Sequence, residues 1–395
     1  MVADDSLYLM VPLEIAWGYL PGRTEPPPRL AERSGGPREA LEEVIGEALR
    51  RPPCGVAFSG GRDSSAVLAI ATLVARRDGL PVPVPITRVF PDAPAAEESR
   101  WQEEVVAHLG LEEWQRVSIH DELDVIGPLA ARHLVEHGVV WPPMIHADIP
   151  LVESLRGGTL LDGEGGDEVL GVAAHRIAPL TRLVRSPRPV RRHRVGAAAR
   201  ALAPARVRAT QLRRRLSGQQ LDWLTTEARE ALLDALAADQ ASQPLSFRES
   251  VHMVPARRTQ TLMARNRGIL AGRHGVELSS PLLHPRVVQA IGDDGGVLGR
   301  GDRTAVLRAF VADLLPDAVL SRVGKATFGE AYMGRQTREF ATRWTGDGID
   351  PRLVRPEAVR DAWLSEERNA LTAALVQSAW LAARGCELRC SARSS

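Results

Sequence analysis

The chain has 395 residues, of which 44% are hydrophobic and 25% charged, with 50 basic against 49 acidic side chains. A chain of this composition can bury a sizeable core, which excludes a globally disordered protein. Its three cysteines, Cys54, Cys386 and Cys390, are too few and scattered for a disulfide framework or a cysteine-based zinc site, and no apolar run reaches the roughly 18 residues that span a membrane. We therefore expect a soluble cytoplasmic protein without a membrane partner.

The N-terminal segment, residues 1–38, is rich in proline and contains a pair of glycines. We expect it to form an arm that leads into one large domain over residues 39–395. In that domain, apolar residues at helical spacing predict a helix from Glu39, and a short apolar run predicts a strand over 55–58. The alternation continues with helices predicted over 65–77 and 96–109 and strands over 82–90, 116–119 and 159–161. This order predicts an α/β fold with a parallel sheet and helices on both faces.

Beyond residue 170 the sequence predicts mostly helix, and the last helix is expected over 369–384 with Gly385 as its cap. Residues 169–221 stand out in this half because they hold 13 arginines and no acidic residue. We expect a solvated helical insertion there. The alternative is an electrostatic platform for an acidic peptide or protein partner. Nucleic acid is a less favoured partner, because the stretch has few aromatic residues on which bases would stack.

A Gly-rich turn joins the first predicted strand to the next helix and reads Ser59-Gly60-Gly61-Arg62-Asp63-Ser64-Ser65. Glycines in such a turn let backbone N–H groups approach an oxyanion, and the helix N-terminus adds partial positive charge. The serine hydroxyls supply further donors, and Asp63 is placed to hold a divalent cation. Since no lysine follows the glycines, the turn is not of the Walker type. The alternative interpretation is an ordinary tight turn.

A second Gly-rich turn follows the strand predicted over 159–161 and reads Asp162-Gly163-Glu164-Gly165-Gly166-Asp167-Glu168. Taken alone, an acidic turn of this kind is typical of a solvated loop or a calcium-binding loop. Together with the first turn, however, it favours a catalytic site.

The first turn resembles the pyrophosphate-binding loop Ser-Gly-Gly-x-Asp-Ser of the nucleotide-pyrophosphatase superfamily. The two turns together resemble the synthetase domain of asparagine synthetases, from about residue 39 to the C-terminus. Further stretches resemble that family in the same order, namely Phe90, Glu98-Ser99, residues 280–288 and residues 302–328. The resemblance implies a doubly wound parallel sheet of the adenine nucleotide alpha hydrolase-like type with a mostly helical C-terminal half.

The resemblance also implies an AMP-forming ligase that uses ATP and Mg²⁺. A substrate carboxylate attacks the α-phosphate of ATP, pyrophosphate leaves, and an amine or ammonia attacks the acyl-adenylate to form an amide. By the same resemblance, Asp63 and Asp167 share magnesium, and Glu164 acts in adenylate formation or accepts a proton from the amine. ATP contacts are expected from Ser59, Gly60, Gly61, Asp63, Ser64, Ser65, Thr87, Arg88, Asp162 and Gly163.

Lys325 is the single lysine of the chain, and the other 49 basic residues are arginines. It stands at the lysine of the family's Arg-x-x-Lys-x-x-Phe segment, so the resemblance implies a catalytic role. A compact ammonium suits charge on the α-phosphate or on the tetrahedral adduct. The alternative is a surface lysine that was retained by chance.

Two departures from the family bear on the substrates. Only 58 residues precede the first turn, residue 2 is Val2 and no cysteine precedes Cys54, so we expect no glutaminase domain. Nitrogen would then come from free ammonia, a separate glutaminase partner or an amine-bearing substrate. The family's aspartate in a Pro-Phe-Leu-Asp stretch is His284 here, and we interpret it as a structural histidine.

Related β-lactam synthetases and lasso-peptide macrolactam cyclases use an amine that is already on the substrate. The former carry Tyr where this chain has Glu164, which weakens that assignment. The preferred hypothesis is an asparagine synthase-like ligase acting on a small-molecule or peptide carboxylate, with a macrolactam cyclase of specialised metabolism as one form. Two alternatives stay open: a pseudoenzyme that binds nucleotide or peptide, and an RNA-modifying ATP pyrophosphatase. The presence of Asp63, Glu164, Asp167 and Lys325 argues against a pseudoenzyme. The second Gly-rich turn and Lys325 argue against an RNA-modifying pyrophosphatase.

Overall fold

The computed structural model describes residues 5–24, 35–185, 191–218, 220–322, 324 and 326–385, and the backbone alone for 386–391. Its centre is a sheet of five parallel strands in the order β3-β2-β1-β4-β5. The strands are β1 (Cys54–Ala57), β2 (Val84–Val89), β3 (Gln115–Ser118), β4 (Thr159–Leu161) and β5 (Glu277–Ser279). The chain winds outward from β1 to β3 and then returns to the other side of β1 for β4 and β5. The predicted doubly wound α/β fold is therefore confirmed.

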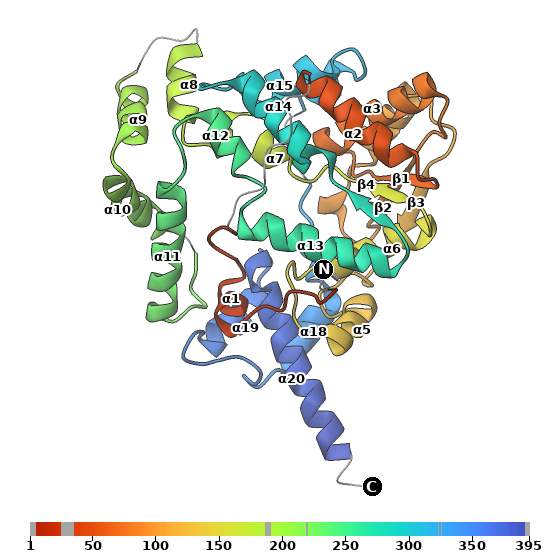
Figure 1. The fold of residues 1–395 in the computed structure, drawn as a ribbon. Coiled ribbons are helices and arrows are strands. Elements are labelled where there is room, and N and C mark those ends of the chain that lie inside the picture. The colour runs from red at the N-terminus through yellow and green to blue at the C-terminus, as the bar shows by residue number, and fades with distance from the viewer. Residues whose placement is uncertain are drawn as a thin grey trace.

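Helices cover both faces of this sheet (Figure 1). One face carries α2 (Pro37–Leu49), α3 (Arg62–Asp78) and α14 (Pro285–Gly295), and the other carries α6 (Ile149–Val152) and α13 (Arg258–Arg273). Successive residues of β4 show the alternation, because Leu161 is buried with α2, α3 and α14 whereas Leu160 is buried with α6 and α13. A strand with two covered faces is apolar throughout, as Leu160 and Leu161 are.

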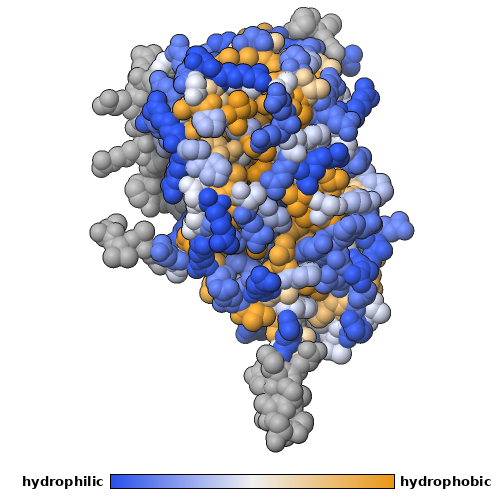
Figure 2. Space-filling model, turned by 90° about the vertical axis from the view of Figure 1, so that its right-hand side faces the viewer, coloured by the Kyte–Doolittle hydropathy of each residue, from blue (hydrophilic) through white to orange (hydrophobic). Residues whose placement is uncertain are grey.

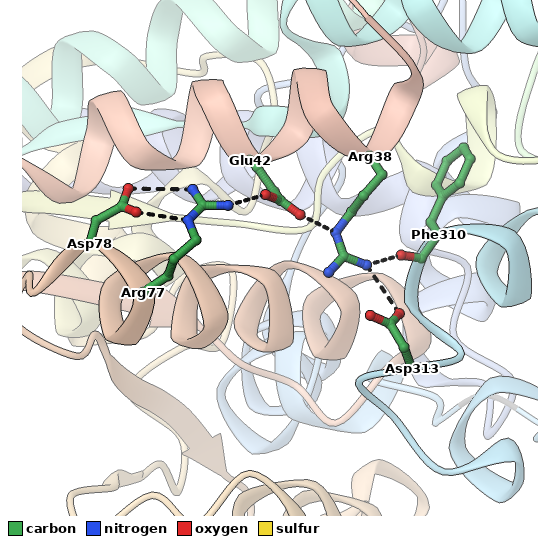
Figure 3. Close-up of polar contacts among 6 residues, drawn as sticks. All are labelled: Arg38, Glu42, Arg77, Asp78, Phe310 and Asp313. Carbon is green, nitrogen blue, oxygen red and sulfur yellow. Dashed lines mark hydrogen bonds and ion pairs between the residues drawn. The ribbon is translucent and has the colours of Figure 1, made fainter.

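A row of charged side chains ties α2 to α3 and to the end of α15 (Arg303–Val311), as Figure 3 shows. Arg38 and Glu42 lie one turn apart on α2, with 2.6 Å between Nε and Oε1. Glu42 also pairs with Arg77 of α3, while Arg38 donates to the carbonyl of Phe310 and lies 3.2 Å from Asp313. Because Glu42 is only 19% exposed and serves two arginines, it links the first two helices of the domain.

A second hydrophobic core joins helices from both ends of the chain. Trp17 of α1 (Pro12–Trp17) is buried there, and its indole Nε1 donates to the carbonyl of Ala228 in α11 (Thr226–Ala241) at 3.0 Å. Trp363 of α19 (Pro356–Leu364) and the start of α20 (Ala373–Ser391) complete this core. Residues 5–24, which we expected to form an arm, are therefore packed into the body of the protein.

The remaining helices are α4 (Ser99–His108), α5 (Pro128–His137), α7 (Gly166–Val169), α8 (Ala178–Arg185), α9 (Arg192–Leu202), α10 (Ala205–Leu216), α12 (Phe247–His252), α16 (Asp317–Leu320), α17 (Gly329–Tyr332) and α18 (Arg335–Arg343). One local prediction is wrong. Gly385 lies inside α20 instead of capping it, since a helix tolerates one glycine at a cost of about 1 kcal/mol. The strand β5 was not predicted in the mostly helical half, because Glu277–Ser279 has no apolar run like that of β4.

The arginine-rich stretch forms α8, α9 and α10 in its described residues. Some of its arginines serve the fold: Arg176 donates to the carbonyl of Ala201, Arg208 donates to the carbonyl of Ala241, and Arg213 pairs with two acidic residues of α11. Others are exposed, namely Arg182, Arg185, Arg191, Arg192, Arg200, Arg206, Arg214 and Arg215. The stretch thus has structural arginines and an exposed set, and an acidic partner for the latter stays a prediction.

In the described part of the chain, no helix is long and apolar enough to cross a bilayer. Figure 2 shows one face of the molecule, on which hydrophobic residues gather mainly in the upper half of the view between hydrophilic ones. Exposed hydrophobic side chains such as Val82 and Val135 are ordinary for a folded protein.

Candidate active site

The two Gly-rich turns meet at the carboxyl end of the sheet. The first joins β1 to α3, and the second joins β4 to α7. Cys54 pairs with Thr159 and Val56 with Leu161, so these neighbouring parallel strands end at the same edge. The strand order reverses between them, and α/β sheets bind their ligands at such a switch point.

A cavity of about 380 Å³ lies between the turns. Its lining includes five arginines, Arg62, Arg88, Arg267, Arg303 and Arg322, and seven acidic residues, Asp63, Glu98, Asp148, Asp162, Glu164, Asp167 and Glu168. A larger hollow of about 950 Å³ lies at the amino ends of β1, β2 and β3, where residues such as Pro53 and Trp114 line it. We place the active site in the smaller cavity, because the charged groups and both turns are there.

The first turn is held by its own serines. Gly60 has φ +80°, a left-handed conformation that glycine adopts without strain, where the chain turns from β1 into α3. Ser59 Oγ accepts a hydrogen bond from the backbone N–H of Gly61 at 3.2 Å and lies 3.2 Å from Ser64 Oγ. Ser64 Oγ donates to the carbonyl of Gly61 at 3.1 Å. The turn thereby presents the N-terminus of the 17-residue helix α3 to the cavity, which favours an anionic group.

Glycines allow the two turns to touch. A Cβ atom at Gly163 would lie 2.7 Å from the backbone nitrogen of Ser64, and one at Gly166 would lie 2.1 Å from the carboxyl carbon of Asp63. Either contact is far shorter than van der Waals distance. The backbone of the second turn therefore lies directly against the first turn, and a side chain at either position would separate them.

Arg303, the first residue of α15, bridges the two carboxylates that we expected to hold magnesium. Its Nε lies 3.0 Å from Asp63 Oδ1, and its terminal nitrogens pair with Asp63 Oδ2 and Asp167 Oδ1. The Asp63 side chain is 13% exposed and that of Asp167 is 54% exposed. The structure therefore brings Asp63 and Asp167 to one point, with an arginine that the sequence did not single out.

The donor set fits magnesium. Among the described residues, no three His, Cys, Asp or Glu side chains form a cluster that would hold a metal ion by themselves. Mg²⁺, however, usually takes one or two protein carboxylates and completes its shell with waters and substrate phosphates. Asp63 and Asp167 supply that number of carboxylates beside the first Gly-rich turn.

Glu164 lies in the second turn and lines the cavity. Burial and the neighbouring charge of Asp162 raise the pKa of Glu164 to about 7, against the opposing effect of Arg267. A carboxyl group with a pKa near neutrality exchanges protons readily at physiological pH, which is the property that a general base or acid requires.

Asp162 is fixed by contacts from two directions. Its Oδ1 accepts a hydrogen bond from the backbone N–H of Glu164 at 3.1 Å, and its Oδ2 lies 2.7 Å from Arg267 of α13. Arg267 also pairs with Asp148 at 2.5 Å, and its side chain is only 11% exposed. Arg267 thus anchors the start of the second turn to α13. Nothing in the sequence marks it among 49 arginines.

The segment on either side of Lys325 is anchored by Glu98. Arg322 pairs with the Glu98 carboxylate and donates to the carbonyl of Gly60 at 2.7 Å, and the backbone N–H of Ala326 donates to Glu98 at 3.3 Å. Gly324 and Ala326 line the cavity. Lys325 itself lies outside the described residues.

A smaller, more apolar cavity of about 130 Å³ adjoins the charged one and shares Ala57, Ser59, Arg88, Leu151 and Phe328 with it. The rings of Phe90 and Phe328 meet edge to face within it, with their centroids 5.7 Å apart. Aromatic and aliphatic walls of this kind suit a flat heterocycle.

The ten residues expected to bind ATP fall into two groups, according to whether they line the charged cavity. Those that line the charged cavity are Ser59, Gly61, Asp63, Ser64, Arg88, Asp162 and Gly163. Gly60, Ser65 and Thr87 do not line it. Thr87 is fully buried, with its hydroxyl donating to the carbonyl of Phe58 and accepting from the indole of Trp114. Its side chain therefore belongs to the core and leaves only the backbone for a ligand.

His284 has a structural role. Its Nδ1 accepts a hydrogen bond from the backbone N–H of Arg286 at 3.3 Å and so caps α14, and burial lowers the pKa of the ring. His284 does not line the charged cavity, whereas the side chain of its neighbour Leu283 packs against Gly165 of the second turn.

Comparison with known families places these observations in context. The asparagine synthase family model matches residues 37–384, which is most of the 395-residue chain. A search of curated proteins found no match. The matched range contains both Gly-rich turns, the arginine bridge and the charged cavity. On this evidence the chain belongs to the asparagine synthase family.

Proposed function

We propose that this protein is an ATP-dependent ligase that forms an amide through an acyl-adenylate. The observation that carries the proposal is one charged cavity shared by two turns, with a phosphate-binding helix start on one and Glu164 on the other. Membership of the asparagine synthase family supports the choice of an ATP-dependent amide ligase.

In the first step, an oxygen of the substrate carboxylate attacks the α-phosphorus of ATP. A phosphorus–oxygen bond forms to the substrate, the bond from the α-phosphorus to the β-bridging oxygen breaks, and pyrophosphate leaves. The first turn and the start of α3 hold the pyrophosphate part, and the aromatic cavity beside Arg88 takes the adenine. Asp63 and Asp167 would hold Mg²⁺, which neutralises charge on the leaving group.

In the second step, the nitrogen of ammonia or an amine attacks the carbonyl carbon of the adenylate. Glu164 accepts the proton that the nitrogen loses, and the bond from carbon to the AMP oxygen breaks. A pKa of about 7 suits Glu164 to this task, because the carboxylate form is available at neutral pH and still basic enough to take the proton. Asp162 and Arg267 position Glu164 by fixing the start of its turn.

The charged lining of the cavity favours a polar acyl substrate. We infer a small-molecule or peptide carboxylate. Asparagine formation from aspartate and ammonia is one specific form of the reaction. Ring closure within a single peptide that carries both carboxylate and amine is the other, and a matched experiment separates them.

The experiment measures the nucleotide products of the reaction and the transfer of ¹⁸O from the substrate carboxylate to AMP. The protein is incubated with Mg·ATP and either ¹⁸O-labelled aspartate plus ammonium, or a peptide and small-molecule extract of its host. We expect AMP and pyrophosphate in one of the two mixtures, and one ¹⁸O atom in the phosphate of AMP in the aspartate mixture if aspartate is the substrate. The same mixtures with Glu164→Gln form the control for site-specific turnover.

Each outcome decides between functions. Asparagine with labelled AMP identifies an ammonia-dependent synthetase, and AMP formed with the extract alone points to a specialised amide. ADP and phosphate would contradict cleavage between the α- and β-phosphates. In a third mixture that holds Mg·ATP and host RNA, AMP release would favour an RNA-modifying pyrophosphatase. Nucleotide binding measured by calorimetry, with no product in any mixture, would favour a pseudoenzyme.

A further inference from the structure

We propose that Arg303 is an exchangeable counter-ion for Asp63 and Asp167: a divalent cation displaces its guanidinium, which then turns to the phosphates of the incoming nucleotide. The inference rests on the proposed function for the identity of the ligand. It assigns to Arg303 a positioning role that the motifs do not indicate.

The first step of the argument is competition for the same oxygens. Arg303 engages both oxygens of Asp63 and one oxygen of Asp167. A divalent cation shared by these carboxylates needs the same oxygens and repels the guanidinium charge. Bound cation and bridging arginine therefore exclude each other, so affinity for the cation alone is reduced by the stability of the bridge.

The second step is that only the Arg303 side chain is free to move. A Cβ atom at Gly171 would lie 2.6 Å from the backbone nitrogen of Arg303, so the backbone there is closely packed. Asp302 caps α15 by accepting from the backbone N–H of Ala305 at 2.9 Å, and Arg62 donates to Thr304 at 3.1 Å. The start of α15 is thus held on both sides, and the change of partner takes place by rotation about side-chain bonds.

The third step is the destination of the guanidinium. Arg303 lines the charged cavity beside the first turn, with Arg62 and Ser64. A guanidinium offers planar, paired donors that match phosphate oxygens, so phosphate is the natural second partner once the carboxylates have taken a cation. Cation and phosphate are then expected to bind cooperatively, because each stabilises the arrangement that the other needs.

The test measures binding without turnover. Free Mn²⁺ is followed by electron paramagnetic resonance as wild type, Arg303→Met and Arg308→Met are titrated, and inorganic pyrophosphate binding in Mg²⁺ is followed by calorimetry. Arg308→Met is the matched control, because Arg308 lies on the same helix and its guanidinium pairs with Asp317 at the surface. It removes the same charge without touching the cavity.

We expect Arg303→Met to bind Mn²⁺ alone about tenfold more tightly than wild type and Mg·pyrophosphate about tenfold more weakly. Adding Asp63→Asn should abolish the tighter Mn²⁺ binding, which locates it at these carboxylates. Mn²⁺ affinity of Arg303→Met equal to that of wild type would overturn the proposal. So would an equal gain in Arg308→Met, which would make the effect one of net charge.

Arg303→Lys keeps the experiment decisive if the methionine variant does not fold, as judged by circular dichroism. An ammonium cannot bridge both carboxylates in the same way, so Mn²⁺ affinity should rise above wild type; an unchanged affinity would count against the proposal. Neither titration requires amide formation. The binding results therefore test the role of Arg303 even if the proposed ligase activity is not found.

Discussion

Glu98 and Arg322 form an ion pair in which each side chain is only 7% exposed. The guanidinium of Arg322 also lies over the ring of Trp101, 5.0 Å from its centroid, and Glu98 occupies the N-cap position of α4. One buried pair therefore connects the helix after β2 with the segment that leads towards Phe328 and lines the active site.

Removing one member of this pair should be costly. We expect Glu98→Ala to lower the free energy of unfolding by about 3–5 kcal/mol, because Arg322 is left buried without its counter-charge. The measurement is denaturant unfolding. Arg51→Ala, which breaks the exposed pair with Glu277, is the control and should change stability by less than about 1 kcal/mol. Similar losses in both variants would show that burial of the pair has no special weight.

Glu164→Gln should slow amide formation by about 10²–10⁴-fold, the usual contribution of a general base. In the wild type the rate should rise with pH and level off above about 7, because the deprotonated carboxylate is the active form and its pKa is about 7. The glutamine variant should lose this limb of the profile. If the rate of Glu164→Gln still rises with pH up to about 7, the pH dependence belongs to another ionisable group.

The raised pKa of Glu164 also predicts how stability depends on pH. The reaction rate should rise with pH, whereas the free energy of unfolding should fall. The folded protein binds an additional proton at Glu164 between the ordinary pKa of 4.5 and about 7, so the free energy of unfolding should fall as pH rises through this window. Glu164→Gln should flatten the slope, as measured by urea unfolding at pH 5 and pH 8. Glu277→Gln, at an exposed position, should leave the slope unchanged. If both variants keep the wild-type slope, the raised pKa is wrong.

Lys325→Arg should reduce the rate by about 10²-fold although charge is retained, because in the catalytic role that the family resemblance implies for Lys325 a planar fork does not replace a compact donor. Single-turnover measurement of AMP release checks this. Thermal unfolding of the variant serves as its control, since the substitution should not affect the fold. A wild-type rate in Lys325→Arg would show that the single lysine of the chain is not required for the reaction.

Glu42→Ala should lower the free energy of unfolding by about 1–3 kcal/mol, because it removes the partner of both Arg38 and Arg77 between α2 and α3 (Figure 3). Asp313→Ala provides the control. That carboxylate is 67% exposed and also pairs with Arg38, yet its loss should cost less than about 1 kcal/mol. Equal effects of the two substitutions would show that the link between α2 and α3 contributes nothing beyond a surface pair.

The sequence predicted four of the five strands and the position of both turns, since those features depend on local patterns. An apolar run followed by Gly60 and Gly61 marks a strand, a turn and a helix start within one short stretch. The strand β4 has the predicted bounds. Family resemblance then indicated that the distant second turn belongs beside the first, which local pattern alone does not contain.

What the sequence did not predict depends on contacts between distant segments. Arg303 is 240 residues from Asp63, and Arg267 is 105 residues from Asp162. In a chain with 49 arginines, the residue type carries no information about which of them enters a site. The packing of Trp17 against α11 was missed for the same reason, because its partner Ala228 is a common helical residue 211 positions away.

The contact of Gly166 with the carboxyl group of Asp63 has a mechanical consequence. Because a Cβ atom at Gly166 would lie 2.1 Å from the carboxyl carbon of Asp63, the carboxyl group fills space that only a glycine leaves open. We therefore expect a ligand that pushes the Asp63 carboxyl group towards Gly166 to move the turn that carries Glu164 as well. In the proposed ligase, binding at the first turn would then be mechanically coupled to the position of Glu164.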